Sequence, residues 1–376
     1  MKLKTLKKMK IKGLRCKFFL AAVLTLTGFS VTAQTYEKSR DVREGYRITS
    51  NVEVQVINKY GDIHLVPWEE DSVVFEIHFS VTSNKQAKVD KIFEYVDFDF
   101  KSTAYYVIAQ TLFQGQNTFW TEMSDMASTV FSSGTNTRID YTVYYPARND
   151  IKIENKFGNI YTTEHTGKVD ITLSNGDLKA YAFLGPTRLK VDFGNLSINE
   201  ITNANMTLGY AEMNLEKAGE LNLETRSSKL YITSCNKMDL DSKRDRIYLK
   251  DAGEITGELF FSYLSVDRAG SKVNIKTNYG DIKILDVSDA FYRMDFSSQN
   301  SDITLYLDEE HLFDMEITRD DRSEIVSSLS LISKSEVPVE GQVKTFKDMC
   351  TAGKQGKPKV PVIINMKSGK LYLMGL

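Results

Sequence analysis

The sequence predicts an all-β fold: a single-stranded-type β-solenoid (β-helix) of about ten short turns, with an N-terminal α+β insertion that caps it. The first observation is a recurring motif, which reads NKYGDI at 58–63, NKFGNI at 155–160 and TNYGDI at 277–282. The second is its period, because weaker copies follow Ile160 at steps of 18, 18, 17, 17, 17, 17 and 18 residues up to Ile282. Self-similarity at a fixed period is typical of stacked repeat proteins.

The third observation concerns three apolar positions in each copy. We call the apolar residue that closes each motif the anchor. The residues seven positions before it and two positions after it are also apolar, except Gly257 and Thr162. A spacing of seven reverses the face of a strand, so all three point inward only if the chain bends between them. Each repeat is therefore predicted to be a strand, a sharp turn, a second strand and a loose return. The anchors are Ile63, Ile160, Leu178, Leu196, Met213, Leu230, Ile247, Leu264, Ile282, Ile303 and Leu371.

The bend is predicted at the Gly-Asp, Gly-Asn, Ser-Lys and Asp-Arg pairs before the anchors, where Gly, Asn and Asp tolerate positive φ. A left-handed hexapeptide helix would need an aliphatic residue every six positions, but Lys190 breaks that series. An amphipathic helical repeat is excluded because Val169, Ile171 and Leu173 alternate with period two.

Residues 1–33 are predicted to be a signal peptide. Eight Lys or Arg and no acid occupy residues 1–17, an apolar run follows at 18–26, and small residues precede a cleavage site between Ala33 and Gln34. The apolar run is about half of the 20 residues that a membrane anchor needs. We therefore expect an exported protein, located in the periplasm, on the outer-membrane surface or outside the cell.

The mature chain is predicted to be acidic, with 40 Lys plus Arg against 50 Asp plus Glu. This balance argues against nucleic acid and anionic membranes as partners. No later segment is apolar for long enough to form a transmembrane span. Cys235 and Cys350 remain after processing, and the sequence leaves open whether they form a disulfide or stay as independent thiols.

The predicted solenoid covers residues 34–310 and is interrupted by an insertion at about 68–146. The insertion is expected to contain strands at 73–81, 98–113 and 138–145 and helices near 85–96 and 117–131, and to cover the open end of the first turns. A C-terminal extension, 311–376, is predicted to hold a solvated charged loop at 314–335 and to end in a final repeat-like strand pair.

Four aromatic residues in the insertion are the candidate ligand-binding residues, because aromatic rings on a rigid repeat scaffold suit sugar rings. The competing interpretation is that they are buried in the cap. They are Tyr105, Tyr106, Phe119 and Trp120.

The sequence predicts no catalytic residues, no metal site and no cofactor. The four histidines do not pair with each other or with Cys at metal-ligand spacing. The position before the anchor mixes Asp, Asn, Lys and Arg, which predicts a solvated ladder with balanced charge. One basic cluster, Lys229 and Arg246 with Arg244 and Asp245 nearby, is the candidate for a glycan-active face.

The NKYGDI, NKFGNI and TNYGDI turns and the Thr32-Ala33-Gln34 processing site resemble the bacterial family of "putative adhesin" or auto-transporter adhesin head domains, common in Bacteroidetes. The resemblance covers roughly residues 51–310, and the middle turns depart from it at Ser228-Lys229 and Asp245-Arg246. It implies an exported, non-enzymatic β-solenoid of uncharacterised function and supplies no functional residues.

We therefore expect a non-enzymatic, adhesin-like protein of the cell envelope or surface that acts as a binding scaffold for an unknown protein or glycan partner. The alternatives are a carbohydrate-binding or glycan-active β-helix protein and a periplasmic sensing or regulatory component. The sequence leaves open the handedness of the coil and its oligomeric state.

Overall fold

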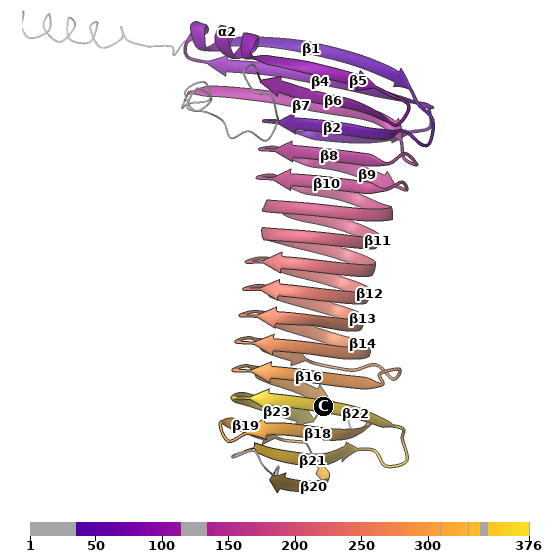
Figure 1. The fold of residues 1–376 in the computed structure, drawn as a ribbon, viewed down its shortest axis with the longest axis vertical. Coiled ribbons are helices and arrows are strands. Elements are labelled where there is room, and N and C mark those ends of the chain that lie inside the picture. The colour runs from indigo at the N-terminus through magenta and orange to yellow at the C-terminus, as the bar shows by residue number, and fades with distance from the viewer. Residues whose placement is uncertain (1–34, 114–133, 309, 330, 339–344, 376) are drawn as a thin grey trace, which may run out of the picture.

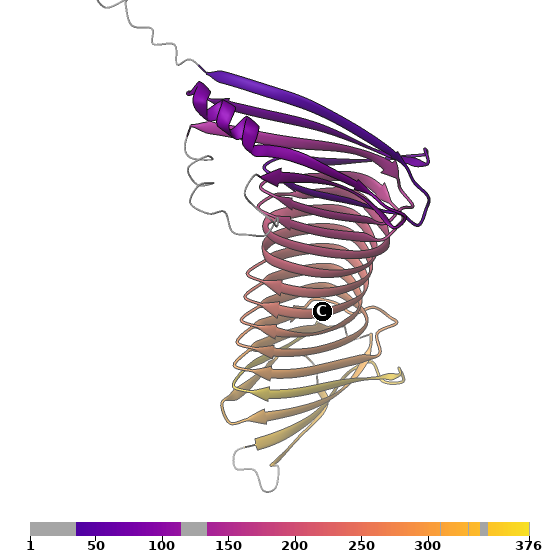
Figure 2. The same cartoon turned by 45° about the horizontal axis from the view of Figure 1, so that its top comes forward.

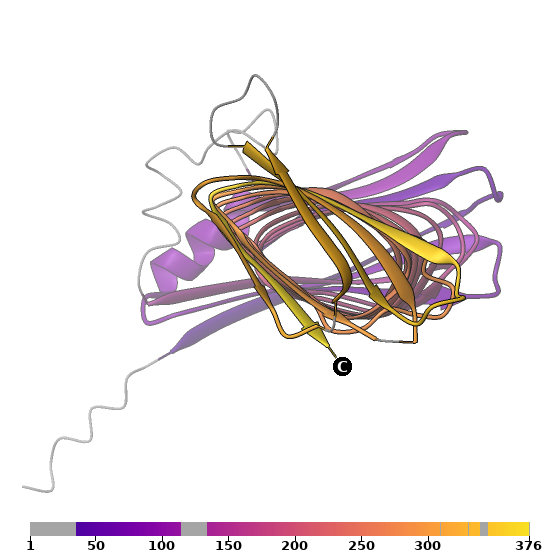
Figure 3. The same ribbon diagram turned by 90° about the horizontal axis from the view of Figure 1, so that it is seen from below.

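The computed structural model describes residues 35–113, 134–308, 310–329, 331–338 and 345–375. Over these residues the chain is nearly all β, with one α-helix, α2 (Gln86–Tyr95). Figure 1 shows a tall stack whose strands lie across its long axis, with α2 at one end. In the tilted view of Figure 2 and the end view of Figure 3 the strands follow one another around a flattened coil.

Successive turns of the stack pair in parallel and in register. Ile171 lies opposite Ile153 on one side and Leu189 on the other, and Leu230 lies opposite Ile247. Partners are 17 or 18 residues apart through most of the stack, as the period predicts. The strands of this central part are β8 (Ile151–Lys156), β9 (Ile160–His165), β10 (Val169–Ser174), β11 (Leu178–Arg226), β12 (Lys229–Lys243), β13 (Arg246–Phe260), β14 (Tyr263–Asn278), β15 (Asp281–Ile284), β16 (Arg293–Gln299) and β17 (Asp302–Leu307).

The core is a column of apolar side chains inside the coil. All the anchors are at most 1% exposed, and the apolar residues predicted before and after them are buried as well. Full burial of one such aliphatic side chain contributes about 1.5–3 kcal/mol. The three inward positions predicted from the sequence are therefore confirmed.

The N-terminal insertion adds strands to the first turn rather than standing apart from it. β6 pairs in parallel with β2, and β7 pairs in parallel with β3. Antiparallel β5 extends the β6 side, while β4 and then β1 extend the β7 side. The strands are β1 (Tyr36–Arg47), β2 (Glu53–Lys59), β3 (Ile63–Trp68), β4 (Ser72–Ser83), β5 (Val96–Ser102), β6 (Tyr106–Phe113) and β7 (Thr135–Pro146).

The helix predicted near 85–96 is confirmed as α2, with Val89 and Ile92 buried and the Phe93 ring stacked 4.9 Å from that of Phe79. The strand-like segment predicted at 98–113 is split into β5 and β6 by a turn at Thr103, whose backbone N–H donates to the Tyr106 carbonyl. The helix predicted at 117–131 lies outside the described residues.

The C-terminal region departs from the predicted order. β22 (Lys359–Lys367) and β23 (Gly369–Gly375) pair with β16 and β17 on one side and with β18 (Leu312–Asp320) and β19 (Ser323–Ser327) on the other. The last repeat along the chain is therefore inserted between two earlier turns, as Figure 1 shows. Beyond it, β21 (Thr345–Gly353) pairs antiparallel with β18, and β20 (Leu331–Pro338) with β21.

The prediction of a solvated charged loop at 314–335 is wrong. Most of that segment is β18 and β19, and Met315 and Ile317 are fully buried. The interpretation failed because the turn at Asp320–Arg322 carries no Gly-Asp pair, although Ile325 lies opposite the anchor Leu371 as a further anchor would.

Cys235 and Cys350 are both buried, on β12 and β21, and no disulfide joins them. Burial raises the pKa of the Cys235 thiol to about 11, so this sulfur is a poor nucleophile at neutral pH. No helix in the described ranges is both long enough and apolar enough to cross a bilayer.

Candidate binding surface

The sharp turn of each repeat depends on a residue with positive φ, and this residue lies one position earlier than the sequence predicts. The residue three positions before each anchor has φ between 49° and 67°, the left-handed region. The Gly-Asp and Gly-Asn pairs that follow were predicted to hold the positive φ. We call these left-handed positions the turn edge: Tyr60, Phe157, Asn175, Phe193, Tyr210, Ser227, Arg244, Phe261, Tyr279, Asn300 and Ser368.

The glycines of the motif have a different role, which is to let neighbouring turns approach. A Cβ added to Gly158 would overlap the carbonyl oxygen of Gly61, and one added to Gly176 would overlap that of Gly158. Because the obstacle is backbone, it cannot move aside by rotating a side chain. Further along the stack the equivalent position holds Ala211 and Ser228, so the requirement is local to the glycine-lined turns.

The turn edge carries exposed aromatic rings in neighbouring pairs. Phe193 and Tyr210 stack with centroids 4.9 Å apart and parallel planes. Phe261 and Tyr279 stack at 4.9 Å, and each of the four is 48–54% exposed. At the N-terminal end Tyr60 and Phe157 stack at 5.4 Å. The signal for these residues was present in the sequence, since an aromatic precedes the glycine in NKYGDI, NKFGNI and TNYGDI.

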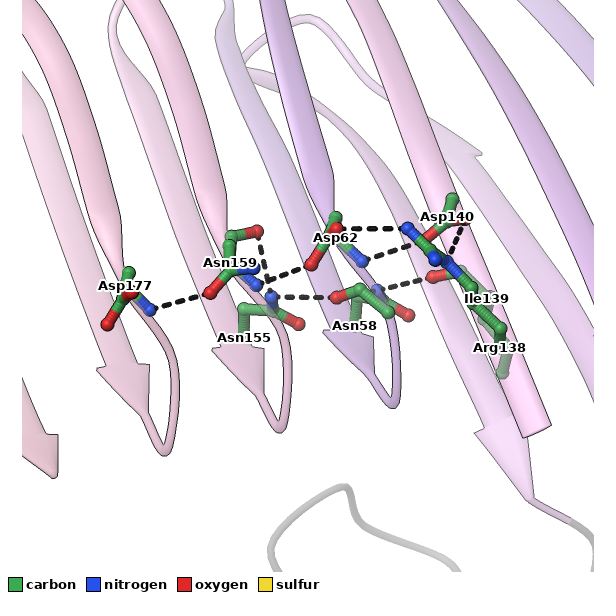
Figure 4. Close-up of polar contacts among 9 residues, drawn as sticks. Asn58, Asp62, Arg138, Ile139, Asp140, Asn155, Asn159 and Asp177 are labelled. Carbon is green, nitrogen blue, oxygen red and sulfur yellow. Dashed lines mark hydrogen bonds and ion pairs between the residues drawn. The ribbon is translucent and has the colours of Figure 1, made fainter. Parts of the chain in front are cut away.

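Beside the turn edge runs a ladder of Asp and Asn side chains, shown in Figure 4. Asp62 Oδ1 accepts the Asn159 backbone N–H at 2.7 Å, and Asn159 Oδ1 accepts that of Asp177 at 2.9 Å. Asp62 and Asp140 lie side by side, and Arg138 contacts both carboxylates at 3.0 and 2.5 Å. The predicted charge balance is therefore present, but at this end of the stack these side chains tie one turn to the next and are not merely solvated.

The Lys229, Arg246, Arg244 and Asp245 cluster is brought together only in part, since Lys229 and Arg246 are register partners on β12 and β13. Lys229, Arg244 and Arg246 are at the surface, whereas Asp245 is 2% exposed. The Asp245 carboxylate accepts hydrogen bonds from Thr225 Oγ1, Ser242 Oγ and two backbone N–H groups at 2.6–3.0 Å. Its hydrogen-bonding capacity is used by donors from its own turn and from the preceding turn, so it stabilises the fold and offers no group to a substrate.

A groove of about 720 Å³ lies beside the Phe261–Tyr279 pair, on the outer face of strands β12, β13, β14, β16, β22 and β18. Phe260 lines it, is 42% exposed, and packs edge-on against Phe261 with centroids 4.6 Å apart. The groove thus joins a three-ring aromatic cluster to a polar floor. The polar residues that line it include Asp241, Lys243, Glu258, Lys276, Asn278, Ser297, Gln299, Arg319, Asn365 and Lys367.

The candidate aromatics of the insertion lie elsewhere. Tyr105 is 80% exposed in the turn before β6, and Tyr106 is half-buried as its first residue. Both stand at the start of the strand that pairs with β2, whereas Tyr60 follows the end of β2, so the structure does not bring them to the turn edge. Phe119, Trp120, Ala33 and Gln34 lie outside the described residues.

The histidines are dispersed, and the described part of the chain holds no group of three or more His, Cys, Asp or Glu side chains placed for a metal ion. His64 is exposed on β3 and stacks on Tyr161 at 4.8 Å, as its outward position predicts. His78 contacts Asp41 at 2.7 Å on the surface. His165 is fully buried, with Nδ1 3.1 Å from the Tyr145 hydroxyl.

His165 makes stability depend on pH. Burial lowers its pKa from 6.5 to about 4, so at intermediate pH the unfolded chain binds a proton that the folded chain does not. Stability from this group is present above pH 6.5 and is lost as pH falls toward 4. As the pH is lowered from 7 to 4.5, the unfolding free energy of the native chain should fall by about 2.5 kcal/mol more than that of His165→Gln. Urea titrations at the two pH values measure this difference. Equal losses in the two chains would contradict this role.

No family model matches the chain, and no curated protein matches its sequence. Among solved structures it is similar to a "putative adhesin" from Parabacteroides distasonis ATCC 8503, with 9% identity, 66% of this chain and 97% of that chain covered, and a TM-score of 0.40. A "putative adhesin" from Bacteroides fragilis NCTC 9343 matches at 9% identity over 66% and 97% of the two chains, with a TM-score of 0.36. One from Parabacteroides merdae ATCC 43184 matches at 10% identity over 69% and 96%, with a TM-score of 0.32. Likeness at this level carries no argument about function.

Proposed function

We propose that this chain is an exported, non-enzymatic β-solenoid of the cell envelope or surface. In this proposal it acts as an adhesin-like binding scaffold and engages its partner through the aromatic residues of the turn edge. The observation that carries the proposal is that five of these left-handed positions hold exposed Phe or Tyr, while a sixth holds the partly buried Tyr60. The repeat period and the parallel in-register pairing support the solenoid.

An aromatic residue at a left-handed position has a free-energy cost. A non-glycine residue in the left-handed region costs about 1–2 kcal/mol, and Asn bears that cost better than an aromatic residue. The chain itself uses Asn175 and Asn300 at equivalent positions. Stacking of an aromatic pair returns about 0.5–1.5 kcal/mol, less than two such residues cost. Local stability therefore does not explain the rings, and strained residues cluster at functional sites.

The rings also suit recognition. They are fixed by backbone geometry and stacked on their neighbours, so little conformational entropy is lost when a ligand covers them. Arg226 lies 5.4 Å from the Tyr210 ring, which adds a cation to this part of the edge. Asp245, whose carboxylate is saturated by four protein donors, is not available as a catalytic group beside Lys229 and Arg246.

The test is a variant that carries Phe193→Asn, Tyr210→Asn, Phe261→Asn and Tyr279→Asn. The mature chain from Gln34 is expected to bind at least one member of a panel of immobilised polysaccharides, mucins and matrix proteins in biolayer interferometry. The variant is expected to bind at least tenfold more weakly, because the exposed rings are gone. Its unfolding free energy is expected to stay within about 1 kcal/mol of native or to rise, since Asn tolerates the left-handed region.

One control variant makes the result interpretable. Tyr181→Ala removes an exposed ring, 59% accessible on β11, that does not belong to the turn edge, and it should leave binding unchanged. If the four-site variant binds as tightly as the native chain, the rings are not the binding surface. If it loses several kcal/mol of stability, the rings are structural and the proposal is wrong.

A further inference from the structure

The groove beside Phe260 and the Phe261–Tyr279 pair carries a more specific inference, which builds on the proposed binding role. Its floor consists of two rows of outward side chains on neighbouring strands. In one row Phe260, Asn278 and Gln299 are register partners, and in the second Lys276 and Ser297 lie opposite each other. Parallel strands repeat at about 4.8 Å, which is comparable to the length of one pyranose unit. A chain of sugar units lying along the stack axis would therefore meet a new pair of side chains, one from each row, at successive strands.

Six of the seven charged side chains that line the groove are paired with each other or with nearby groups, and the seventh, Lys367, forms no ion pair with the described residues. Lys276 Nζ lies 2.8 Å from Glu258 Oε1, and Lys243 Nζ lies 3.5 Å from Asp241 Oδ1. Arg319 Nε lies 2.7 Å from the buried Asp348 carboxylate. A strongly charged ligand would have to compete with these contacts, whereas a neutral ligand would leave them in place. The charge pattern therefore favours an uncharged partner.

The uncharged groups have the chemistry that recognises hydroxyls. Asn278, Gln299 and Asn365 present amides, each able to accept and to donate hydrogen bonds. Asn278 Oδ1 is buried and accepts no hydrogen bond from the described residues, so a ligand donor would pair with it once the amide turns toward the groove. Phe260 provides an apolar ring face next to these amides, and such faces pack well against the C–H groups of a sugar ring.

We propose that this groove binds a neutral oligosaccharide, with one sugar ring against Phe260 and its hydroxyls hydrogen-bonded to Asn278, Gln299 and Asn365. The turn-edge rings Phe261 and Tyr279 flank the same ligand where it leaves the groove. The inference rests on the proposed binding role and adds to it the ligand class and the position of the site along the stack.

The experiment is a glycan-array screen of the mature chain from Gln34, followed by calorimetric titration with each neutral glycan retained. Phe260→Ala and Asn278→Ala are each expected to raise Kd at least tenfold. Tyr181→Ala, the matched loss of an exposed strand aromatic outside the groove, should change Kd less than twofold. Thermal unfolding confirms that each variant is folded, and Gln299→Ala repeats the test at an exposed side chain if Phe260→Ala is unstable.

Retention of neutral glycans with these losses supports the inference. Retention of sulfated or uronic-acid glycans only, equal losses in the groove variants and Tyr181→Ala, or no glycan binding at all would overturn it. If glycan binding is absent while a protein from the panel still binds and is lost in the four-site Asn variant, the inference fails and the proposed function stands. If glycan binding requires Phe260 but is unaffected by the four-site Asn variant, the glycan site in the groove is supported and the turn edge is not the binding surface.

Discussion

Substituting Gly158 by Ala should destabilise the protein by about 2–3 kcal/mol, because the added methyl group would overlap the carbonyl oxygen of Gly61 in the turn above. The backbone of Gly158 itself is not in the left-handed region, so the cost comes from the close approach of two turns and not from φ. Chemical denaturation followed by far-ultraviolet circular dichroism measures the difference.

The matched control is the preceding residue. Phe157 has φ 58°, and Phe157→Asn should stay within about 1 kcal/mol of native, because relief of the left-handed strain offsets the lost contact with Tyr60. The two adjacent substitutions thus separate close packing from backbone strain. A nearly neutral Gly158→Ala would show that the turn relaxes into the geometry that already accommodates Ala211.

Deleting residues 359–376 should have the largest effect of any change considered. It removes β22 and β23, which pair with β16, β17, β18 and β19 at once. Because β18 and β19 then lose their parallel partners, we expect β18, β19 and β21 to open. Hydrogen exchange should show at least a hundredfold loss of protection in β18 and β21, which corresponds to about 2.7 kcal/mol or more.

The internal control for this deletion is the middle of the stack. β12 and β13 pair with each other and with β11 and β14, none of which is deleted, so their exchange should change little. A point variant, Ile364→Asp, buries a charge in the same turn without shortening the chain and should produce the same pattern more weakly. Unchanged protection of β18 in both variants would refute the inserted arrangement.

Much of the fold was predictable because the signals are local. The anchors and their companion positions alternate with period two on each side of the turn, and burial follows from that alternation alone. The helix α2 was predicted for the same reason, since Val89, Ile92 and Phe93 recur at helical spacing. β18 and β19 were missed because their turn at Asp320–Arg322 lacks the motif, although their apolar alternation is intact.

The candidate surface was predictable only in part. The aromatic before each glycine was visible in the motif, yet the left-handed backbone that exposes it belongs to the turn as a whole and was assigned one residue too late. Asp245 looked like a member of a basic cluster, and its inward direction became evident only from the donors that surround it. The groove combines residues of β12 and β22, more than a hundred positions apart along the chain.

The repeat, its period and the inward residues can be read from the amino-acid sequence, because each depends on spacing within one turn. Which turns are neighbours follows only from the folded chain. Every repeat offers the same apolar face and the same row of backbone donors and acceptors, so the period cannot say whether Leu371 follows Ile303 or Ile325 in space. Only the packing of all turns together places β22 and β23 between β16 and β18, and that placement completes the floor of the groove.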